Sequence, residues 1–148
     1  MIVRNRVEVM HGVNLDQLGR RDPLHYGELT LDELERQVTE MARELGLETR
    51  FFHTNHEGQF VEHLHRLDEL ADGLIVNPGA WTHYSYAIHD ALELSGLPAV
   101  EVHLSDVEAR EGFRRHSVIS DLCIGRVAGR GLESYRAALE QLAAELAR

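Results

Sequence analysis

The sequence contains no lysine, and all 15 of its basic residues are arginines. A guanidinium cannot supply the amine that Schiff-base chemistry, pyridoxal attachment or a Walker-type phosphate-binding site requires. The absence of lysine therefore excludes these three classes of site.

Cysteine and long apolar runs are also scarce. Cys123 is the single cysteine, so the chain cannot form an internal disulfide. No apolar run approaches the roughly 18 residues of a membrane span, and Arg4, Arg6 and Glu8 stand where a signal peptide has its apolar core. We therefore expect a cytoplasmic protein without a membrane partner.

Positive charge is in the minority, because 25 acidic residues outnumber 15 basic ones and the formal net charge is -10. Nucleic acids and anionic membranes are bound by surfaces that neutralise dense negative charge. The composition argues against both partners, and any anionic ligand must be held by local groups.

What the chain does have is a regular alternation of short β-rich runs and helix-like segments along its 148 residues. This alternation is typical of an α/β fold with a mostly parallel sheet, and the length fits one domain. We expect a single doubly wound five-stranded sheet, in which ligands bind beyond the carboxyl ends of the strands. The predicted strands are 6–10, 48–53, 73–76, 99–104 and about 123–127.

Local signals predict the ends of several helices. Thr30 to Glu33 has the form of a capping box before an apolar helical pattern that stops at Gly46. Thr82 is the expected N-cap of a helix that ends at Gly96, and the last helix is expected over about 132–146.

A long irregular segment from Asn14 to Glu28 follows the first strand and contains Arg20, Arg21 and Tyr26. Connections of this length in compact domains are often functional lids. A tyrosine becomes a useful base only when its ordinary pKa of about 10 falls toward neutrality, which takes roughly 4 kcal/mol for about three units. A close, desolvated arginine can supply that stabilisation.

Polar residues follow each of the first four predicted strands. Because the carboxyl ends of parallel strands meet at one edge of the sheet, we expect these residues to converge. Glu101 and His103 are two apart in a strand and share a face, so the carboxylate would orient the imidazole of a general acid. The converging residues are Asn14, residues 55–57, Asn77, His103 and Ser105.

Five motifs occur in order over roughly residues 7–140. They are HGVNL at 11–15 with LGRRDP at 18–23 and YG at 26–27, TNHEG at 54–58, NPGAWTH at 77–83, EVHLS at 101–105, and ARE at 109–111 with FRRHS at 113–117. Together they resemble the motifs of the type II 3-dehydroquinate dehydratases, and five ordered motifs are a specific signal.

This resemblance implies a flavodoxin-like fold and the elimination of water from 3-dehydroquinate. The product is 3-dehydroshikimate, formed through an enolate intermediate without metal or cofactor. By resemblance, Tyr26 removes a proton from C2 and Arg21 lowers its pKa. Asn14 holds the water that stabilises the enolate oxygen, and His103, oriented by Glu101, protonates the departing hydroxyl.

The resemblance also implies the substrate contacts. Asn77, His83 and Arg114 would hydrogen-bond the substrate hydroxyls. The backbone N–H of Leu104 and the side chain of Ser105 would bind the substrate carboxylate.

Assembly is implied in the same way, because the family commonly forms trimers that assemble into dodecamers. Asp90 would then reach the site of a neighbouring subunit. The whole chain, 1–148, would be one such domain with a catalytic lid at about 16–28. The reaction would belong either to the shikimate pathway of aromatic amino acid biosynthesis or to quinate catabolism.

Five positions depart from the family pattern, and one of them adds a carboxylate beside the expected carboxylate-binding Ser105. Like charges brought together in a binding site cost several kcal/mol. A paralogous lyase or isomerase acting on a related cyclic hydroxy-keto acid is therefore an alternative. The departures are His11, Val13, Tyr84, Asp106 and Glu108.

Two other function classes compete less well. The ten histidines include close pairs at 53/56 and 63/65, but neither pair has the HExxH spacing of a metallohydrolase. Glycines at 125, 129 and 131 lack the GxGxxG pattern of a nucleotide-binding module and follow the last predicted strand instead of the first. Cys123 falls in a predicted strand, where a small core residue is expected.

Overall fold

The computed structural model describes residues 3–20, 24 and 28–148. Its centre is a five-stranded sheet with the strand order β2-β1-β3-β4-β5, and all four strand pairs are parallel. This arrangement confirms the single doubly wound α/β fold. The strands are β1 (Arg6–His11), β2 (Glu48–His53), β3 (Gly73–Asn77), β4 (Ala99–His103) and β5 (Gly125–Ala128).

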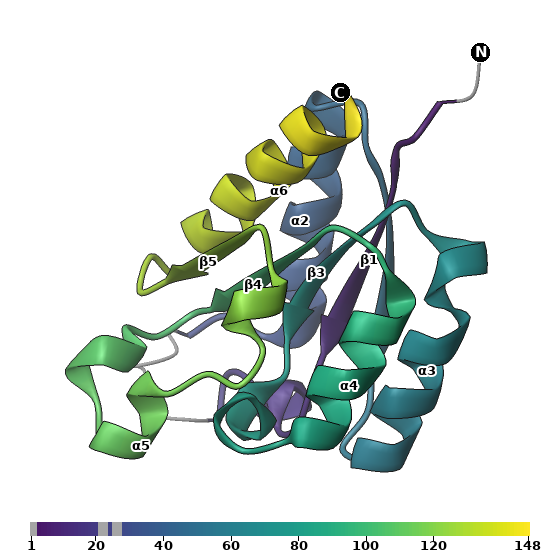
Figure 1. The fold of residues 1–148 in the computed structure, drawn as a ribbon. Coiled ribbons are helices and arrows are strands. Elements are labelled where there is room, and N and C mark those ends of the chain that lie inside the picture. Colours follow the sequence, from purple (N-terminus) through teal and green to yellow (C-terminus); the bar gives the residue numbers. More distant parts are fainter. Residues whose placement is uncertain (1–2, 21–23, 25–27) are drawn as a thin grey trace.

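Helices cover both faces of the sheet (Figure 1). The helices α2 (Leu31–Glu44) and α6 (Glu133–Leu146) pack on one face, and α3 (Glu57–Leu70) and α4 (Tyr86–Ser95) on the other. Short turns lie on the loops: η1 (Leu15–Gln17), η2 (Gly79–His83), η3 (Val107–Ala109), α5 (Gly112–Arg115) and η4 (Ser120–Leu122).

Burial follows the position of each strand in the sheet. Every residue of β3 and β4 is buried, as expected of strands covered by helices on both faces. The edge strand β2 is only partly covered. In α2, Leu34, Val38 and Met41 recur at helical spacing and form the buried stripe that packs on the sheet. Among the described residues, no helix is long and apolar enough to cross a membrane.

The predicted N-cap of α2 is confirmed, and the predicted N-cap of α4 is wrong. Thr30 Oγ1 accepts a hydrogen bond from the backbone N–H of Glu33 at 3.2 Å, as the capping box predicts. The prediction for Thr82 is wrong, because residues 79–83 form η2 and the cap of α4 is Ser85. Its hydroxyl accepts from the N–H of Ile88 at 3.1 Å. The hydroxyl of Thr82 is therefore available for a hydrogen bond in the interior of the protein.

The loops after β1 and β3 interlock through two glycines. The N–H of Gly12 donates to the carbonyl of Asn77 at 2.7 Å, and a Cβ on Gly12 would lie 2.2 Å from the carbonyl oxygen of Pro78. Gly79 has a φ of +66°, and a Cβ there would lie 2.6 Å from the carbonyl oxygen of Val13. Only glycine fits either position, so the two loops are held in direct contact.

Candidate active site

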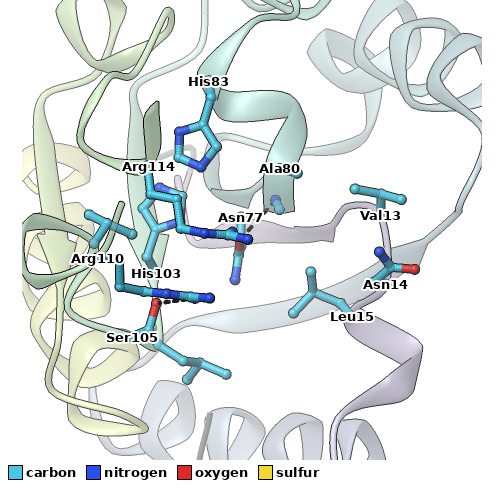
Figure 2. A pocket seen from close by; sticks show the side chains of 13 residues that line it. Val13, Asn14, Leu15, Asn77, Ala80, His83, His103, Ser105, Arg110 and Arg114 are labelled. Atoms are coloured by element: carbon cyan, nitrogen blue, oxygen red, sulfur yellow. Dashed lines mark hydrogen bonds between the residues drawn. The ribbon is translucent and has the colours of Figure 1, made fainter. Parts of the chain in front are cut away.

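A cavity of about 150 Å³ opens at the carboxyl ends of β1, β3 and β4. Figure 2 shows His103, Ser105, Arg110 and Arg114 on one side of it, opposite Leu15. Of the residues predicted for the site, the cavity brings together Asn14, Asn77, His83, His103, Leu104, Ser105 and Arg114.

Asn14 enters the cavity from an unusual backbone conformation. Its φ of 69° and ψ of 4° lie in the left-handed region, which asparagine tolerates better than most residues. The side chain of Asn55 holds this turn, because its Oδ1 accepts from the N–H of Asn14 at 2.8 Å and its Nδ2 donates to Asp16 at 3.2 Å. Asn55 therefore supports the site from behind the lining.

The other two residues of the 55–57 motif also lie behind the lining formed by the described residues. His56 is the N-cap of α3, and the Glu57 carboxylate accepts a hydrogen bond from the Ser85 hydroxyl. The expectation that residues 55–57 converge on the cavity is corrected. They fasten η1 and α4 to the start of α3.

The carboxamide of Asn77 has a fixed orientation. Its Oδ1 accepts the backbone N–H of Gly79 at 3.0 Å. The amide nitrogen is consequently the end that can donate to a ligand. Tyr135 is fully buried near this side chain, and burial raises the pKa of Tyr135 to about 12.

His103 and Glu101 form a tight buried pair. The Nε2 of His103 is 2.5 Å from Oε2 of Glu101, which is fully buried. Burial alone would raise the pKa of Glu101, but the hydrogen bonds from His103, Thr82 and Ser117 outweigh it, and the pKa falls below its ordinary value. Glu101 is thus held as a carboxylate that fixes the orientation of the imidazole ring.

His83 is held by the segment that carries α5. Its Nδ1 lies 2.7 Å from the carbonyl oxygen of His116, which can only accept, so Nδ1 carries the hydrogen and Nε2 is left for a ligand. Burial lowers the pKa of His83, which favours this neutral form. The ring of Phe113 meets His83 edge-on at 5.6 Å, and the guanidinium of Arg114 lies 4.7 Å from the centre of the same ring.

Arg110 is a lining residue that sequence reasoning missed. Its Nη1 lies 3.5 Å from Oγ of Ser105, as the dashed line in Figure 2 marks. Arg110 and Arg114 give the cavity two cations although the whole chain is acidic. Arg110 belongs to the ARE motif at 109–111, but nothing in the local sequence shows that this segment folds back over the end of β4.

Two departures from the family pattern lie outside the cavity lining of the described chain. His11 is buried on the α2 face of the sheet, where its Nε2 is 3.0 Å from Glu35. The carboxylate of Asp106 accepts the N–H of Glu108 at 3.2 Å and thereby caps η3. Neither side chain is therefore part of the described cavity lining, whereas Val13 is.

The comparisons with known proteins agree with the motifs. Residues 5–143 match the family described as Dehydroquinase class II. The chain belongs to this family. A relative named 3-dehydroquinate dehydratase in Syntrophotalea carbinolica is 49% identical over 135 residues, covering 90% of this chain and 91% of the relative.

Solved structures of class II dehydroquinases have the same fold. The type II dehydroquinase of Propionibacterium acnes superposes with a TM-score of 0.90 at 40% identity, covering 97% of this chain and 99% of the other. That of Butyrivibrio crossotus also has a TM-score of 0.90, at 37% identity, covering 94% and 97% of the two chains. The family match favours the dehydroquinase interpretation over a metallohydrolase or a nucleotide-binding module.

Glu101 lies behind the described lining, where it pairs with His103, and three further expected residues of this dehydroquinase are absent from that lining. Arg21 and Tyr26 lie outside the described residues. Asp90 is exposed on α4, paired with His89 at 2.9 Å, and lies away from the cavity of its own chain. The role of Asp90 at a neighbouring subunit stays a prediction.

His63 and Cys123 of the dehydroquinase do not belong to the described cavity lining. His63 is buried against Glu8 at 2.7 Å and stacks on Phe52 at 3.8 Å. Within the described part of the chain, no cluster of three or more histidine, cysteine or acidic residues could hold a metal ion. Burial raises the pKa of Cys123 to about 12, so its thiol is a poor nucleophile.

Proposed function

We propose that this class II dehydroquinase eliminates water from 3-dehydroquinate to give 3-dehydroshikimate through an enolate intermediate. The observation that carries the proposal is the buried pair of His103 and Glu101, which faces a cavity containing two arginines. The relatives named 3-dehydroquinate dehydratase support this choice of substrate.

The carboxylate of the substrate binds at the end of β4. The backbone N–H of Leu104 and the hydroxyl of Ser105 donate to it, and Arg110 places a cation beside Ser105. Charge-assisted hydrogen bonds of this kind are about twice as strong as neutral ones. Local groups thus bind an anion in a protein whose net charge is -10.

The hydroxyls of the substrate bind on the other side of His103. Asn77 donates through its amide nitrogen, because its oxygen is already used by Gly79. His83 accepts through Nε2, because Nδ1 donates to the carbonyl of His116. Arg114 donates through its guanidinium. The three side chains present both donors and an acceptor, which suits a polyhydroxylated ring.

His103 is the general acid of the reaction. A hydroxyl leaves poorly as hydroxide, so a group that protonates it lowers the barrier. Because Nε2 is directed at the carboxylate of Glu101, Nδ1 is the nitrogen that gives its proton to the departing hydroxyl. Glu101 stabilises the imidazolium before that transfer and keeps the ring in place.

The base and the enolate support come from the segment after β1. The proton next to a ketone is weakly acidic, so the reaction needs a base and a group that stabilises the enolate oxygen. Tyr26 is the base and Arg21 the cation that lowers its pKa, both assigned by their motif positions. Asn14 holds the water that hydrogen-bonds the enolate oxygen, from its fixed left-handed turn.

The direct test adds 3-dehydroquinate to the purified protein and follows the ultraviolet absorbance of the enone product. We expect turnover without added metal or cofactor, and unchanged turnover after treatment with a chelator. Folded protein that fails to turn over 3-dehydroquinate would reject the substrate and favour the paralogous lyase or isomerase.

Two variants test the acid and the base. We expect Tyr26→Phe and His103→Ala each to abolish turnover while circular dichroism shows an intact fold. His65→Ala is the matched control for the acid, because this histidine is exposed on α3 and does not line the cavity. Near-normal activity in either site variant would remove that residue from the mechanism.

We also propose that the protein assembles into trimers and that these form a dodecamer. Exposed apolar side chains occur on α4 and the turn before it, at Tyr84, Tyr86 and Leu94, and Asp90 lies on the same helix. Exposed apolar side chains that gather on one surface can mark an interface between subunits. A dodecamer would have about twelve times the chain mass of 16.8 kDa in light scattering. A monodisperse monomer would contradict the assembly and leave the role of Asp90 without support.

A further inference from the structure

A half-buried arginine, Arg126, lies beside the carboxylate that holds the acid. Arg126 in β5 is in register with Glu101 in β4, so the two side chains share one face of the sheet. The Nε of Arg126 is 3.7 Å from Oε2 of Glu101. The same oxygen accepts from His103 at 2.5 Å. The carboxylate is therefore shared between an imidazole and a permanent cation.

The guanidinium of Arg126 is largely withdrawn from solvent. Only 23% of the side chain is exposed, and its Nε and Nη2 are buried without a hydrogen-bond partner in the described chain. Its second contact is outward, where Nη1 lies 3.5 Å from Oε1 of Glu108. Glu108 is 64% exposed, so water screens its charge more strongly than that of Glu101.

The charge of Arg126 should weaken the attraction between the Glu101 carboxylate and a protonated His103. The imidazole should then give up its proton more easily. A carboxylate that already interacts with one cation attracts a second cation less, and a like charge a few ångströms away disfavours protonation of the imidazole. Among the described residues, the thiol of Cys123 also lies near Glu101, and burial raises its pKa to about 12, so it stays neutral. Three further charged or titratable groups line the cavity beside His103, namely His83 from η2 and Arg110 and Arg114 from the segment after β4. Arg126 differs from these three because it is not part of the described cavity lining.

We propose that Arg126 is a positioning residue that acts through Glu101 to make His103 a stronger acid, and that Glu108 moderates this effect from the surface. The proposal rests on the proposed dehydration, in which His103 protonates the leaving hydroxyl. It assigns a role in the reaction to a residue that touches neither substrate nor reacting atoms.

The test compares the pH dependence of kcat in three variants. The alkaline limb reports loss of the acid, so Arg126→Gln should move this limb upward by about one pH unit and lower kcat severalfold on the plateau. Arg126→Lys keeps the cation and should stay close to the wild-type profile. Glu108→Gln removes the moderating charge and should move the limb slightly downward.

A second measurement does not depend on turnover. The imidazole titration of His103 can be followed by NMR in the unliganded protein, with the signal assigned by its absence in His103→Gln. Arg126→Gln should shift the midpoint in the same direction as the kinetic limb. If 3-dehydroquinate is not a substrate, the kinetic arm fails while this titration still decides the role of Arg126.

The proposal is overturned if Arg126→Gln loses stability or kcat while both the alkaline limb and the His103 titration stay in place. That result would make Arg126 a structural residue only. A Lys variant that behaves like Gln would also overturn it, because the charge would then not be the property that matters.

Discussion

The hydroxyl of Thr82 donates a 2.6 Å hydrogen bond to Oε2 of Glu101. Thr82 is fully buried in η2, and this contact joins the turn that carries His83 to the strand that carries His103. The two cavity-lining histidines are therefore linked through a carboxylate that is not itself part of the described lining.

Thr82→Val should remove this donor with little change in shape. Loss of a hydrogen bond to a buried charged group leaves the carboxylate less well satisfied, so we expect the free energy of unfolding to fall by about 1–3 kcal/mol. We expect kcat to fall severalfold, because Glu101 then holds His103 less rigidly. Chemical denaturation and steady-state kinetics measure both effects. Thr82→Ser keeps the hydroxyl and should restore kcat, and equal kcat in the Val and Ser variants would contradict the role.

Phe113→Ala should weaken substrate binding. The ring contacts both His83 and Arg114, through an edge-on contact worth about 0.5–1.5 kcal/mol and a cation–π contact worth about 0.5–1 kcal/mol. Loss of both should raise KM roughly tenfold, with a smaller change in kcat. Phe113→Tyr retains the ring and serves as the control. An unchanged KM in Phe113→Ala would show that His83 and Arg114 are ordered without the ring.

Asp106→Asn should leave KM within about twofold of wild type. The carboxylate of Asp106 accepts the N–H of Glu108 at the start of η3, and asparagine caps about as well as aspartate. Asp106→Ala removes the cap and should cost about 1 kcal/mol of stability with KM again little changed. A KM that falls severalfold in the Asn variant would mean that the carboxylate faces the substrate after all.

Asp72→Asn should reduce stability at neutral pH but not in acid. The hydrogen bond from the Arg6 guanidinium holds the pKa of Asp72 below its ordinary value, against a smaller opposing effect of burial. A carboxyl whose folded pKa is depressed stabilises the fold above its unfolded pKa of about 3.9, and this contribution is lost as pH falls through the folded value.

Urea unfolding of wild type and Asp72→Asn from pH 7 downward measures that difference. The gap between their free energies of unfolding should be constant near neutrality and should shrink as the pH drops below about 4. A gap that persists unchanged in acid would mean that the Asp72 carboxylate is not the source of the stability.

The strands and the first capping box could be predicted because their signals are local. Apolar runs bounded by glycine and asparagine set the strand limits to within two residues, and Thr30 caps α2 as its sequence pattern indicates. Even the error at Thr82 is instructive. Both Thr82 and Ser85 are good caps by composition, and only the extra turn of η2 decides which of them begins α4.

The contacts around the acid could not be predicted, because they depend on which strands are neighbours. Arg126 meets Glu101 only because β5 lies beside β4 in a register that pairs them. Arg110 reaches Ser105 only because the segment after β4 folds back over the strand end. Neither fact has a signature within a window of a few residues, whereas the two-residue spacing of Glu101 and His103 already placed that pair on one face.

The close contacts at Gly12 and Gly79 limit how the loops after β1 and β3 can evolve. Any side chain at Gly12 would collide with the backbone of Pro78, and any side chain at Gly79 would collide with that of Val13. Neither loop can move alone to make room for a substrate with a bulkier ring. Evolution toward a new substrate must therefore replace both loops together or change other residues that line the cavity. Libraries aimed at new specificity should keep both glycines and vary Ala80 and Val107, which line the cavity and are not among the atoms that crowd either glycine.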